Sequence, residues 1–216
     1  MGSSEVRGKF LVFEGCEGSG KSTQLRMLSE YLGKIGVNFI MTREPGGNPI
    51  SEEIRKIILN GKNTAMCDEC EALLYAAARI QHLKEIIEPA LAAGKLVVCD
   101  RYVYSSLAYQ GYARGLGDYV KEINAYALTN YPPDMTVFLD ISPEDAFKRK
   151  HGADENDRME QLGLEFHKKV YAGYKELEKE YADVRAVDCS GTKYRTAEKI
   201  RLLVDGLLGV SDGKTL

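Results

Sequence analysis

The sequence predicts an α/β fold in which a five-stranded parallel sheet has helices on both of its faces, a three-layer arrangement. Two observations lead to this prediction. Five short apolar segments alternate with longer segments in which apolar residues recur at three- and four-residue spacing. The first apolar segment also runs into a glycine-rich loop and then a helix, the order typical of a phosphate-binding loop, or P-loop. The length suits a single domain, residues 1–216, with a short lid at about 148–158.

The phosphate-binding loop is the most specific local motif. Residues 15–22 read GCEGSGKS and fit the pattern G-x-x-x-x-G-K-[ST]. Glycines let backbone N–H groups approach phosphate oxygens, and the helix that follows points the positive end of its dipole at the same anion. We expect Lys21 to reach the β- and γ-phosphates of ATP and Ser22 to join the coordination of Mg²⁺. The predicted ATP-binding residues are Gly15, Cys16, Glu17, Gly18, Ser19, Gly20, Lys21, Ser22 and Thr23.

The first half of the chain is predicted to form two strands and three helices. The strands are Lys9–Glu14 and Val37–Thr42, and the helix between them begins near Lys21. Ser51 is expected to cap a second helix that runs through Asn60, since acidic residues follow it in the first turn. A third helix is predicted from about Glu69 to Ala93, with a proline near its end that can kink it.

The second half continues the alternation. The remaining strands are predicted at Lys95–Cys99, Met135–Ile141 and Val184–Asp188. Helices are predicted at Asp118–Asn130, from Ser142 onward with Pro143 in the first position, at Arg158–Glu180 and at Glu198–Leu208. The segment Tyr102–Gly117 is rich in tyrosine and polar residues, so we expect a surface that contacts a ligand rather than core.

Asp100 follows the central strand Lys95–Cys99 directly. A carboxylate at the carboxyl end of such a strand is where nucleotide-binding sheets place a group that organises Mg²⁺. The alternative is a structural ion pair between Asp100 and Arg101.

Composition limits the partners. The net charge is −3 with a sequence pI of about 5.8, so no global basic field favours nucleic acid or an anionic membrane. There is no run of eighteen apolar residues, so no membrane span is expected, and Met1–Lys9 contains no apolar signal segment. We therefore expect a cytoplasmic protein.

The sequence contains five cysteines, and two of them, Cys67 and Cys70, form a lone C-x-x-C. A zinc site would need further ligands at suitable spacing, and no second pair is present in the sequence. Reduced thiols before a helix are therefore expected in preference to a metal or redox site.

A phosphate-binding loop alone does not distinguish a kinase from a switch GTPase or a motor. The guanine-reading N-K-x-D is missing from the sequence, and the chain is short for a motor. Tyr75 and Arg79 are four residues apart on one predicted helix and so share a face. There a ring can stack on a base and a guanidinium can reach a base carbonyl. The alternative is an ordinary amphipathic helix with an exposed arginine.

Six segments in order, FEGCEGSGKSTQ, TREPGG, YAAARIQH, DRYVYSSLAYQG, PPDMTVFLDISPE and NDRME, resemble thymidylate kinases. The resemblance extends from about Phe10 to Asp188. It implies a nucleoside monophosphate kinase fold and transfer of the ATP γ-phosphoryl to dTMP, giving dTDP and ADP for dTTP synthesis, with Mg²⁺. It also implies a homodimer. Alternatives are another nucleoside or monophosphate kinase of the same fold, and a nucleotide-binding regulator without catalysis.

The resemblance also implies roles for single residues. Glu17 matches the carboxylate that holds the sugar 3′-hydroxyl, and Tyr75 stands where the family usually stacks a phenylalanine on thymine. The other implied substrate-binding residues are Arg79 at the thymine O4, Ser106 and Gln110 as further base contacts, and Arg55 and Arg101 near the dTMP phosphate. Asp100 matches the carboxylate that organises the metal through water, and Glu44-Pro45 matches a loop often built with a cis proline.

The source of a catalytic cation is the last expectation. One branch of the family has an arginine inside the phosphate-binding loop, where this chain has Gly18, so the resemblance implies a cation supplied by the lid. Ala153 stands where a catalytic arginine is expected, so we favour Arg149, then Arg158, then Lys150, which comes last because it lacks the planar fork of arginine. The predicted catalytic residues are Lys21, Arg101, Arg149 and Arg158.

Overall fold

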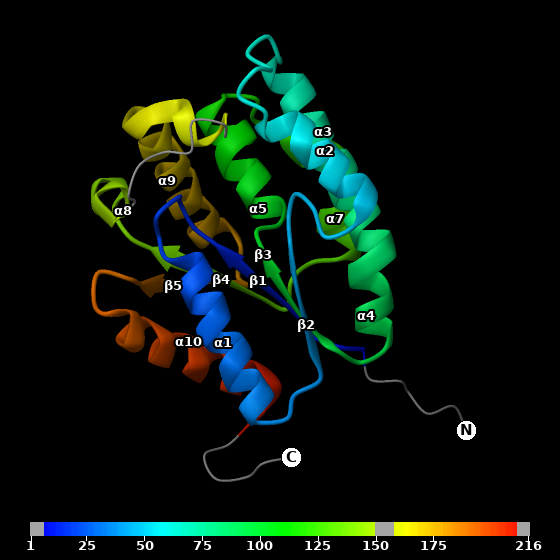
Figure 1. Ribbon diagram of the computed structural model, residues 1–216, viewed down its shortest axis with the longest axis vertical. Coiled ribbons are helices and arrows are strands. Elements are labelled where there is room, and N and C mark those ends of the chain that lie inside the picture. The colour runs from blue at the N-terminus through cyan, green and yellow to red at the C-terminus, as the bar shows by residue number, and fades with distance from the viewer. Residues whose placement is uncertain (1–6, 150–157, 211–216) are drawn as a thin grey trace.

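The computed structural model describes residues 7–149 and 158–210. Five strands form one parallel sheet in the order β2-β3-β1-β4-β5, which confirms the predicted fold class (Figure 1). The strands are β1 Phe10–Glu14, β2 Phe39–Arg43, β3 Leu96–Asp100, β4 Met135–Asp140 and β5 Val184–Asp188. Because β1 is the central strand, the loop that follows it lies in the middle of the row formed by the carboxyl ends of the strands.

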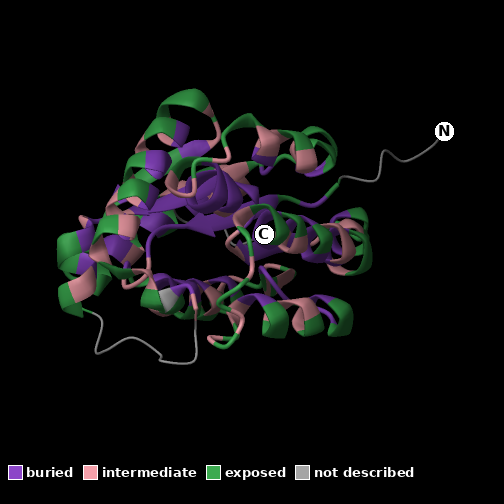
Figure 2. Cartoon of the chain, turned by 90° about the horizontal axis from the view of Figure 1, so that it is seen from above, coloured by how far each residue is buried: buried purple, intermediate pink, exposed green. Residues whose placement is uncertain are grey.

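Alternate residues of the central strands belong to two separate cores, one on each face of the sheet. In β1, Phe10 and Val12 lie in one core, whereas Leu11 and Phe13 lie in the other. The second core is closed by α1 Lys21–Lys34 and α10 Lys193–Leu208, and the first by helices that include α9 Gly163–Glu180. Buried residues accordingly concentrate in the middle layer and exposed ones on the outer helices (Figure 2). The continuous apolar sequence of these strands is explained by burial on both faces.

Helix α2 runs from Pro49 to Leu59, and the predicted Ser51 cap was wrong. Asn48 is the N-cap, and its Oδ1 accepts a hydrogen bond from the Ser51 amide at 2.9 Å. Pro49 fits the first helical position, where its missing N–H costs nothing, so the helix begins earlier than expected. The buried Ser51 hydroxyl instead donates to the carbonyl of Ala78 on the next helix.

The long helix predicted from about Glu69 to Ala93 has the expected length, but it is not a single regular α-helix. It consists of α3 Asp68–His82, a π-helical segment η1 Leu83–Ile87 and α4 Glu88–Ala92. Pro89 falls in the first turn of α4, directly after the π-helical segment. Proline is tolerated at this position because the first turn of a helix does not need its N–H.

The segment Tyr102–Gly117 was predicted as a surface that contacts a ligand rather than core. Its exclusion from the core was wrong, although Ser105, Ser106, Tyr109 and Gln110 do line a hollow. It forms α5 Val103–Ser106 and a π-helical segment η2 Leu107–Ala113, and three of its four tyrosines are buried. The buried hydroxyls have partners: that of Tyr102 donates to the Tyr131 carbonyl, and that of Tyr104 to Asp183. Burial of tyrosine costs little once its hydroxyl is hydrogen-bonded.

The remaining helices differ from prediction mainly at their ends. The segment Asp118–Asn130 is divided into α6 Asp118–Ile123 and α7 Ala125–Asn130. α8 Pro143–Arg149 has the predicted Ser142 cap, whose hydroxyl accepts from the Asp145 amide at 3.1 Å. α9 starts only after a short 3₁₀ turn, η3 Glu160–Leu162, and α10 starts at Lys193, where Thr192 caps it.

Two expectations about the chain as a whole can be compared with the described residues. No helix among them is long and apolar enough to cross a membrane. Cys67 and Cys70 are exposed free thiols, and residues 7–149 and 158–210 contain no cluster of metal-ligating side chains. Most of the predicted lid, residues 150–157, lies outside the described residues, and with it Lys150 and Ala153.

Candidate functional site

The site is formed at the carboxyl ends of the central strands, where ligands bind in open parallel sheets. β1 and β3 end level with each other, since Phe13 pairs with Asp100 in the register of the sheet. The amide of Arg101 continues this pairing and donates to the Phe13 carbonyl at 2.8 Å. The phosphate-binding loop after β1 and the Asp100-Arg101 turn after β3 are therefore neighbours.

Two hollows meet at this edge of the sheet. The larger, of about 620 Å³, follows the phosphate-binding loop from Glu17 to Gln24 and is completed by Arg149 and the segment before α10. The smaller, of about 210 Å³, lies between α3, α5 and the Asp100-Arg101 turn. Glu17, Lys21 and Ser22 line both hollows, so each hollow opens on the same short stretch of the loop.

Gly18 in the larger hollow is required by the packing of α8. Its φ is +77°, and a Cβ built on it would lie 2.4 Å from the Ala146 carbonyl oxygen. This is the position where the resemblance implied that some related chains carry an arginine. The fold of this chain leaves no room for a side chain there.

Lys21 is the cation of the loop. Its Nζ donates to the Gly15 carbonyl at 3.1 Å, and the side chain is buried. Burial, and then the nearby charge of Arg101, lower the pKa of Lys21 below its ordinary value. An anionic phosphate bound in the loop would supply the opposite charge that favours the ammonium form.

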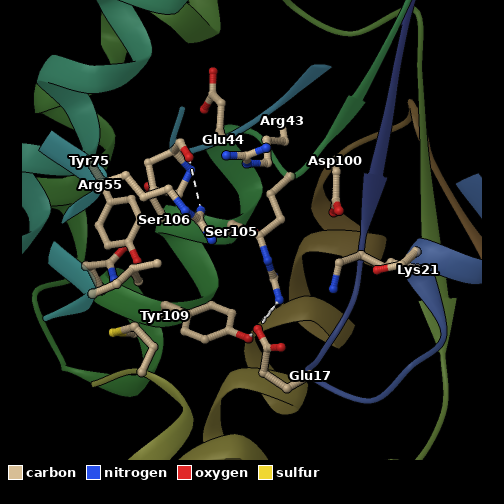
Figure 3. Close-up of a pocket in the computed structure, with 16 residues that line it drawn as sticks. Glu17, Lys21, Arg43, Glu44, Arg55, Tyr75, Asp100, Ser105, Ser106 and Tyr109 are labelled. Atoms are coloured by element: carbon tan, nitrogen blue, oxygen red, sulfur yellow. Dashed lines mark hydrogen bonds and ion pairs between the residues drawn. The ribbon is translucent and has the colours of Figure 1, made fainter. Parts of the chain in front are cut away.

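The smaller hollow brings together most of the predicted substrate residues, and Figure 3 shows Tyr75 and Lys21 at its opposite ends. Those that line it are Glu17, Arg55, Tyr75, Arg101, Ser106 and Gln110. Further lining residues that were not predicted individually are Arg43, Leu59, Ser105, Tyr109 and Met159, although Ser105 and Tyr109 belong to the segment Tyr102–Gly117 that was predicted to contact a ligand. The TREPGG segment carries Arg43 at the end of β2, opposite Asp100 in the register, so strand pairing could have indicated it.

Arg101 lies between the two hollows in an unusual backbone conformation. Its φ is +69°, a region that costs a non-glycine residue about 1–3 kcal/mol. Its guanidinium pairs with Glu17 at 2.5 Å, donates to the Ser105 hydroxyl at 3.1 Å and lies 5.2 Å from the centre of the Tyr109 ring. The alternative of an Asp100–Arg101 ion pair is not observed among the described residues.

Glu14 holds the turn that carries Arg101. Its fully buried carboxylate accepts hydrogen bonds from the amides of Tyr102 and Ser105, at 2.9 and 3.0 Å. The hydroxyls of Ser105 and Tyr174 also donate to it, at 2.6 and 2.7 Å. Burial is the largest influence on Glu14 and raises its pKa, against the opposing charge of Arg101 and these hydrogen bonds.

Arg79 does not line the smaller hollow, although the resemblance implied a contact with the base. Its side chain is 2% exposed and bridges Glu44, Ser106, Asn124 and the Tyr102 carbonyl. The shared face of Tyr75 and Arg79 was predicted from helix spacing. Helix spacing alone could not show that the Arg79 guanidinium binds the segment Tyr102–Ser106 and does not face the hollow with Tyr75.

The two lid arginines of the described residues lie in different places. Arg149 lines the larger hollow, and its Nη2 donates to the Ser190 carbonyl at 3.3 Å. Arg158 lines neither hollow: its guanidinium binds the carboxylate of Glu71, and its Nε donates to the Ile58 carbonyl at 3.1 Å. The structure thus brings Arg149, but not Arg158, to the phosphate-binding loop.

Asp100 fits a place beside a bound cation. Its Oδ1 is buried and has no hydrogen-bond partner in the part of the chain that the structure describes. An unpartnered carboxylate oxygen costs free energy unless a ligand satisfies it. Ser22 and Asp100 both line the smaller hollow, so hydroxyl and carboxylate oxygens, the donors that Mg²⁺ prefers, are available together.

A phosphate-binding loop between two hollows that share its lysine, with arginines facing the second hollow, is the arrangement of a P-loop kinase acting on a small phosphorylated acceptor. The family profile described as thymidylate kinase matches residues 13–200. The chain belongs to the thymidylate kinase family, as the resemblance predicted.

Individual relatives agree with this family. The thymidylate kinase of Clostridium novyi is 51% identical over 81% of this chain and 87% of its own length. That of Finegoldia magna is 47% identical over 84% of this chain and 90% of its own. That of Bacillus licheniformis is 45% identical over 94% of this chain and 98% of its own. The residues matched by the family profile, 13–200, include every residue that lines either hollow.

The raised pKa of Glu14 leads to a pH prediction. Above pH 4.5, the ordinary value, the unfolded chain releases this proton while the folded chain retains it, so the contribution of Glu14 to the free energy of unfolding falls as pH rises toward the folded pKa. The free energy of unfolding of Glu14→Gln lacks this loss. We therefore expect the free energy of unfolding of Glu14→Gln, minus that of the unchanged protein, to increase with pH across this range. Urea unfolding at a series of pH values measures the difference, with the exposed Glu53→Gln as control. A difference that shrinks with pH would contradict the prediction.

Proposed function

We propose that this chain transfers the γ-phosphoryl group of ATP to dTMP, giving ADP and dTDP, and so supplies a precursor of dTTP. The observation that carries the proposal is the sharing of Glu17, Lys21 and Ser22 by two hollows. ATP in the larger hollow and dTMP in the smaller one would present their phosphates to each other across Lys21. Such positioning, with charge stabilisation, is most of what phosphoryl transfer requires from a protein.

The acceptor roles follow the resemblance. Tyr75 stacks on thymine, Ser106 and Gln110 contact its edge, and Glu17 holds the sugar 3′-hydroxyl. Arg55 and Arg101 bind the dTMP phosphate; the pairing of Arg101 with Glu17 keeps both side chains at the opening between the hollows. For Arg79 we propose an indirect role, since its hydrogen bonds hold Ser106 and the Tyr102 carbonyl from behind.

Mg²⁺ is the cation we propose, held by Ser22 and, through water, by Asp100. The unpartnered Asp100 oxygen supports this choice. When bound, the ion neutralises phosphate charge. Arg149 would supply a further cation at the transferring group, because Gly18 cannot carry one. Arg158 and Lys150 are the other candidates.

We also propose that the chain acts as a homodimer through α2 and α3, which lie side by side (Figure 1). Ile50 and Ile57 on α2 and Leu73 on α3 are 55%, 48% and 48% exposed. Exposed large apolar residues on adjacent helices are typical of an association surface.

A cytoplasmic location is proposed because the thiols of Cys67 and Cys70 are free and exposed, which suits a reducing compartment.

The reaction is tested by coupling ADP release to an optical signal with ATP, Mg²⁺ and each nucleoside monophosphate in turn. We expect dTMP to give the highest kcat/KM and thymidine none. Lys21→Ala should abolish turnover while leaving the fold intact by circular dichroism. ATP binding without phosphoryl transfer to any acceptor would instead favour a regulator, and preference for another monophosphate would change the acceptor.

Arg149→Ala is expected to lower kcat by roughly two to three orders of magnitude with little change in dTMP affinity, the pattern of a contact made mainly in the transition state. Lys148→Ala is a matched control, because this neighbouring cation is 76% exposed and pairs with Asp145. Steady-state kinetics measure both variants. An unchanged kcat for Arg149→Ala would transfer the role to Arg158 or Lys150.

The dimer is tested by measuring mass in solution. We expect twice the 24.0 kDa of one chain, and expect Ile57→Lys to reduce the mass to that of one chain by placing a charge in the apolar surface. Leu202→Lys is the matched control, since Leu202 is 61% exposed on α10, outside this surface. A monomeric unchanged protein, or dissociation by the control alone, would contradict the proposal.

A further inference from the structure

Glu71 is a fully buried carboxylate beside the acceptor hollow, but it lines neither hollow itself. It lies one helical turn before Tyr75 on α3, so its side chain shares a face with that ring. Two guanidinium groups neutralise its charge: Arg114 Nη2 donates to it at 2.9 Å, and Arg158 binds the same oxygen. A buried charge paired in this way stays in a defined position.

The other oxygen of Glu71 binds Gln110. Gln110 Nε2 donates to Glu71 Oε1 at 2.8 Å, and the Gln110 side chain is 1% exposed. A carboxylate with two arginine partners accepts hydrogen bonds and offers none, so only the NH₂ end of the amide can face it. The carbonyl end, Oε1, is thereby directed away from Glu71.

This orientation matters because Gln110 lines the acceptor hollow. Within residues 7–149 and 158–210, Gln110 Oε1 accepts no hydrogen bond, and it is not among the fully buried unpartnered atoms of these residues. The oxygen is therefore available to a molecule in the hollow. Gln110 presents a fixed acceptor there, although a glutamine amide can in general present either a donor or an acceptor.

A fixed acceptor distinguishes pyrimidines by the atom at ring position 3. Thymine and uracil carry an N–H there and can donate to the Gln110 oxygen. Cytosine has a lone pair at the same atom, so the two acceptors would face each other without a proton. Turning the amide over to suit cytosine would place its oxygen against Glu71 Oε1, so that two acceptors face each other, and this carboxylate oxygen would keep only the 3.4 Å hydrogen bond from Arg114 Nε.

We propose that Glu71 is a positioning residue that sets base selectivity, because it locks the Gln110 amide in the orientation that accepts a hydrogen bond from thymine and rejects cytosine. The inference rests on the proposed binding of the base beside Gln110. It goes further by placing the discrimination in a residue that does not touch the base.

The test compares dTMP, dUMP and dCMP in the unchanged protein and in Glu71→Gln, by kcat/KM and by calorimetric Kd. An amide at position 71 can donate or accept, so both orientations of Gln110 become allowed. We expect the dTMP-to-dCMP preference to fall roughly 10- to 100-fold, which corresponds to about 1.4 to 2.8 kcal/mol, the range for a mismatched hydrogen bond. The dTMP-to-dUMP preference should stay constant, since both bases donate from position 3. A general loss of structure would not produce this pattern.

Two further variants complete the design. Arg114→Met removes an ion pair from Glu71 but leaves the Gln110 contact, so the base preference should remain. The double variant Glu71→Gln with Gln110→Glu restores an acceptor facing the base and keeps a carboxylate in the cluster, so the preference should return. This double variant also serves if Glu71→Gln alone does not fold.

The outcomes separate the inference from the proposed function. No turnover or binding of dTMP by the unchanged protein would overturn the proposed function. A protein that prefers dTMP and retains the full dTMP-to-dCMP preference in Glu71→Gln would overturn the inference alone. So would loss of the preference in a folded double variant, or a loss in Arg114→Met equal to that in Glu71→Gln.

Discussion

Hydrogen bonds to the buried carboxylate of Glu14 are the constraint on which the site depends. They fix the amides of Tyr102 and Ser105, and with them the left-handed backbone of Arg101. Glu14 is also the last residue of the central strand, directly before the phosphate-binding loop. One side chain thus joins the loop that binds the donor to the turn that faces the acceptor, and the favourable contacts there offset the unfavourable conformation of Arg101.

The packing of α8 against the phosphate-binding loop limits where a positive charge can be placed. Ala146 of α8 lies against Gly18, so a side chain at position 18 would collide with α8, and we propose that the catalytic cation comes from another element. Arg149 ends α8 and lines the donor hollow. Arg158, across the lid, is bound to Glu71 near the base end of the acceptor hollow. Arg149 and Arg158, at the two ends of the predicted lid, therefore lie in different parts of the site, one lining the larger hollow and one bound to Glu71.

Much of this was predictable because it follows from local spacing. The loop between β1 and α1, the five strands of the parallel sheet and the Ser142 cap were predicted correctly from local sequence patterns. The errors concern contacts between residues far apart in sequence. Ser51 is a residue type typical of a helix cap, but its hydroxyl donates to the Ala78 carbonyl. The tyrosines after Arg101 appear polar until their hydroxyl partners, the Tyr131 carbonyl and Asp183, are known. The role of Glu71 could not be predicted from the sequence, because its partners Gln110, Arg114 and Arg158 are far from it in the chain.

The central claim is that donor and acceptor meet head to head over Glu17, Lys21 and Ser22. A single molecule in which adenosine and thymidine are joined through their 5′ ends by a chain of phosphates tests this most directly. Calorimetry with competition should show one such molecule bound to each chain, displacing both ATP and dTMP. If it displaces only one of them while the other still binds, the two hollows do not face each other and the account is contradicted.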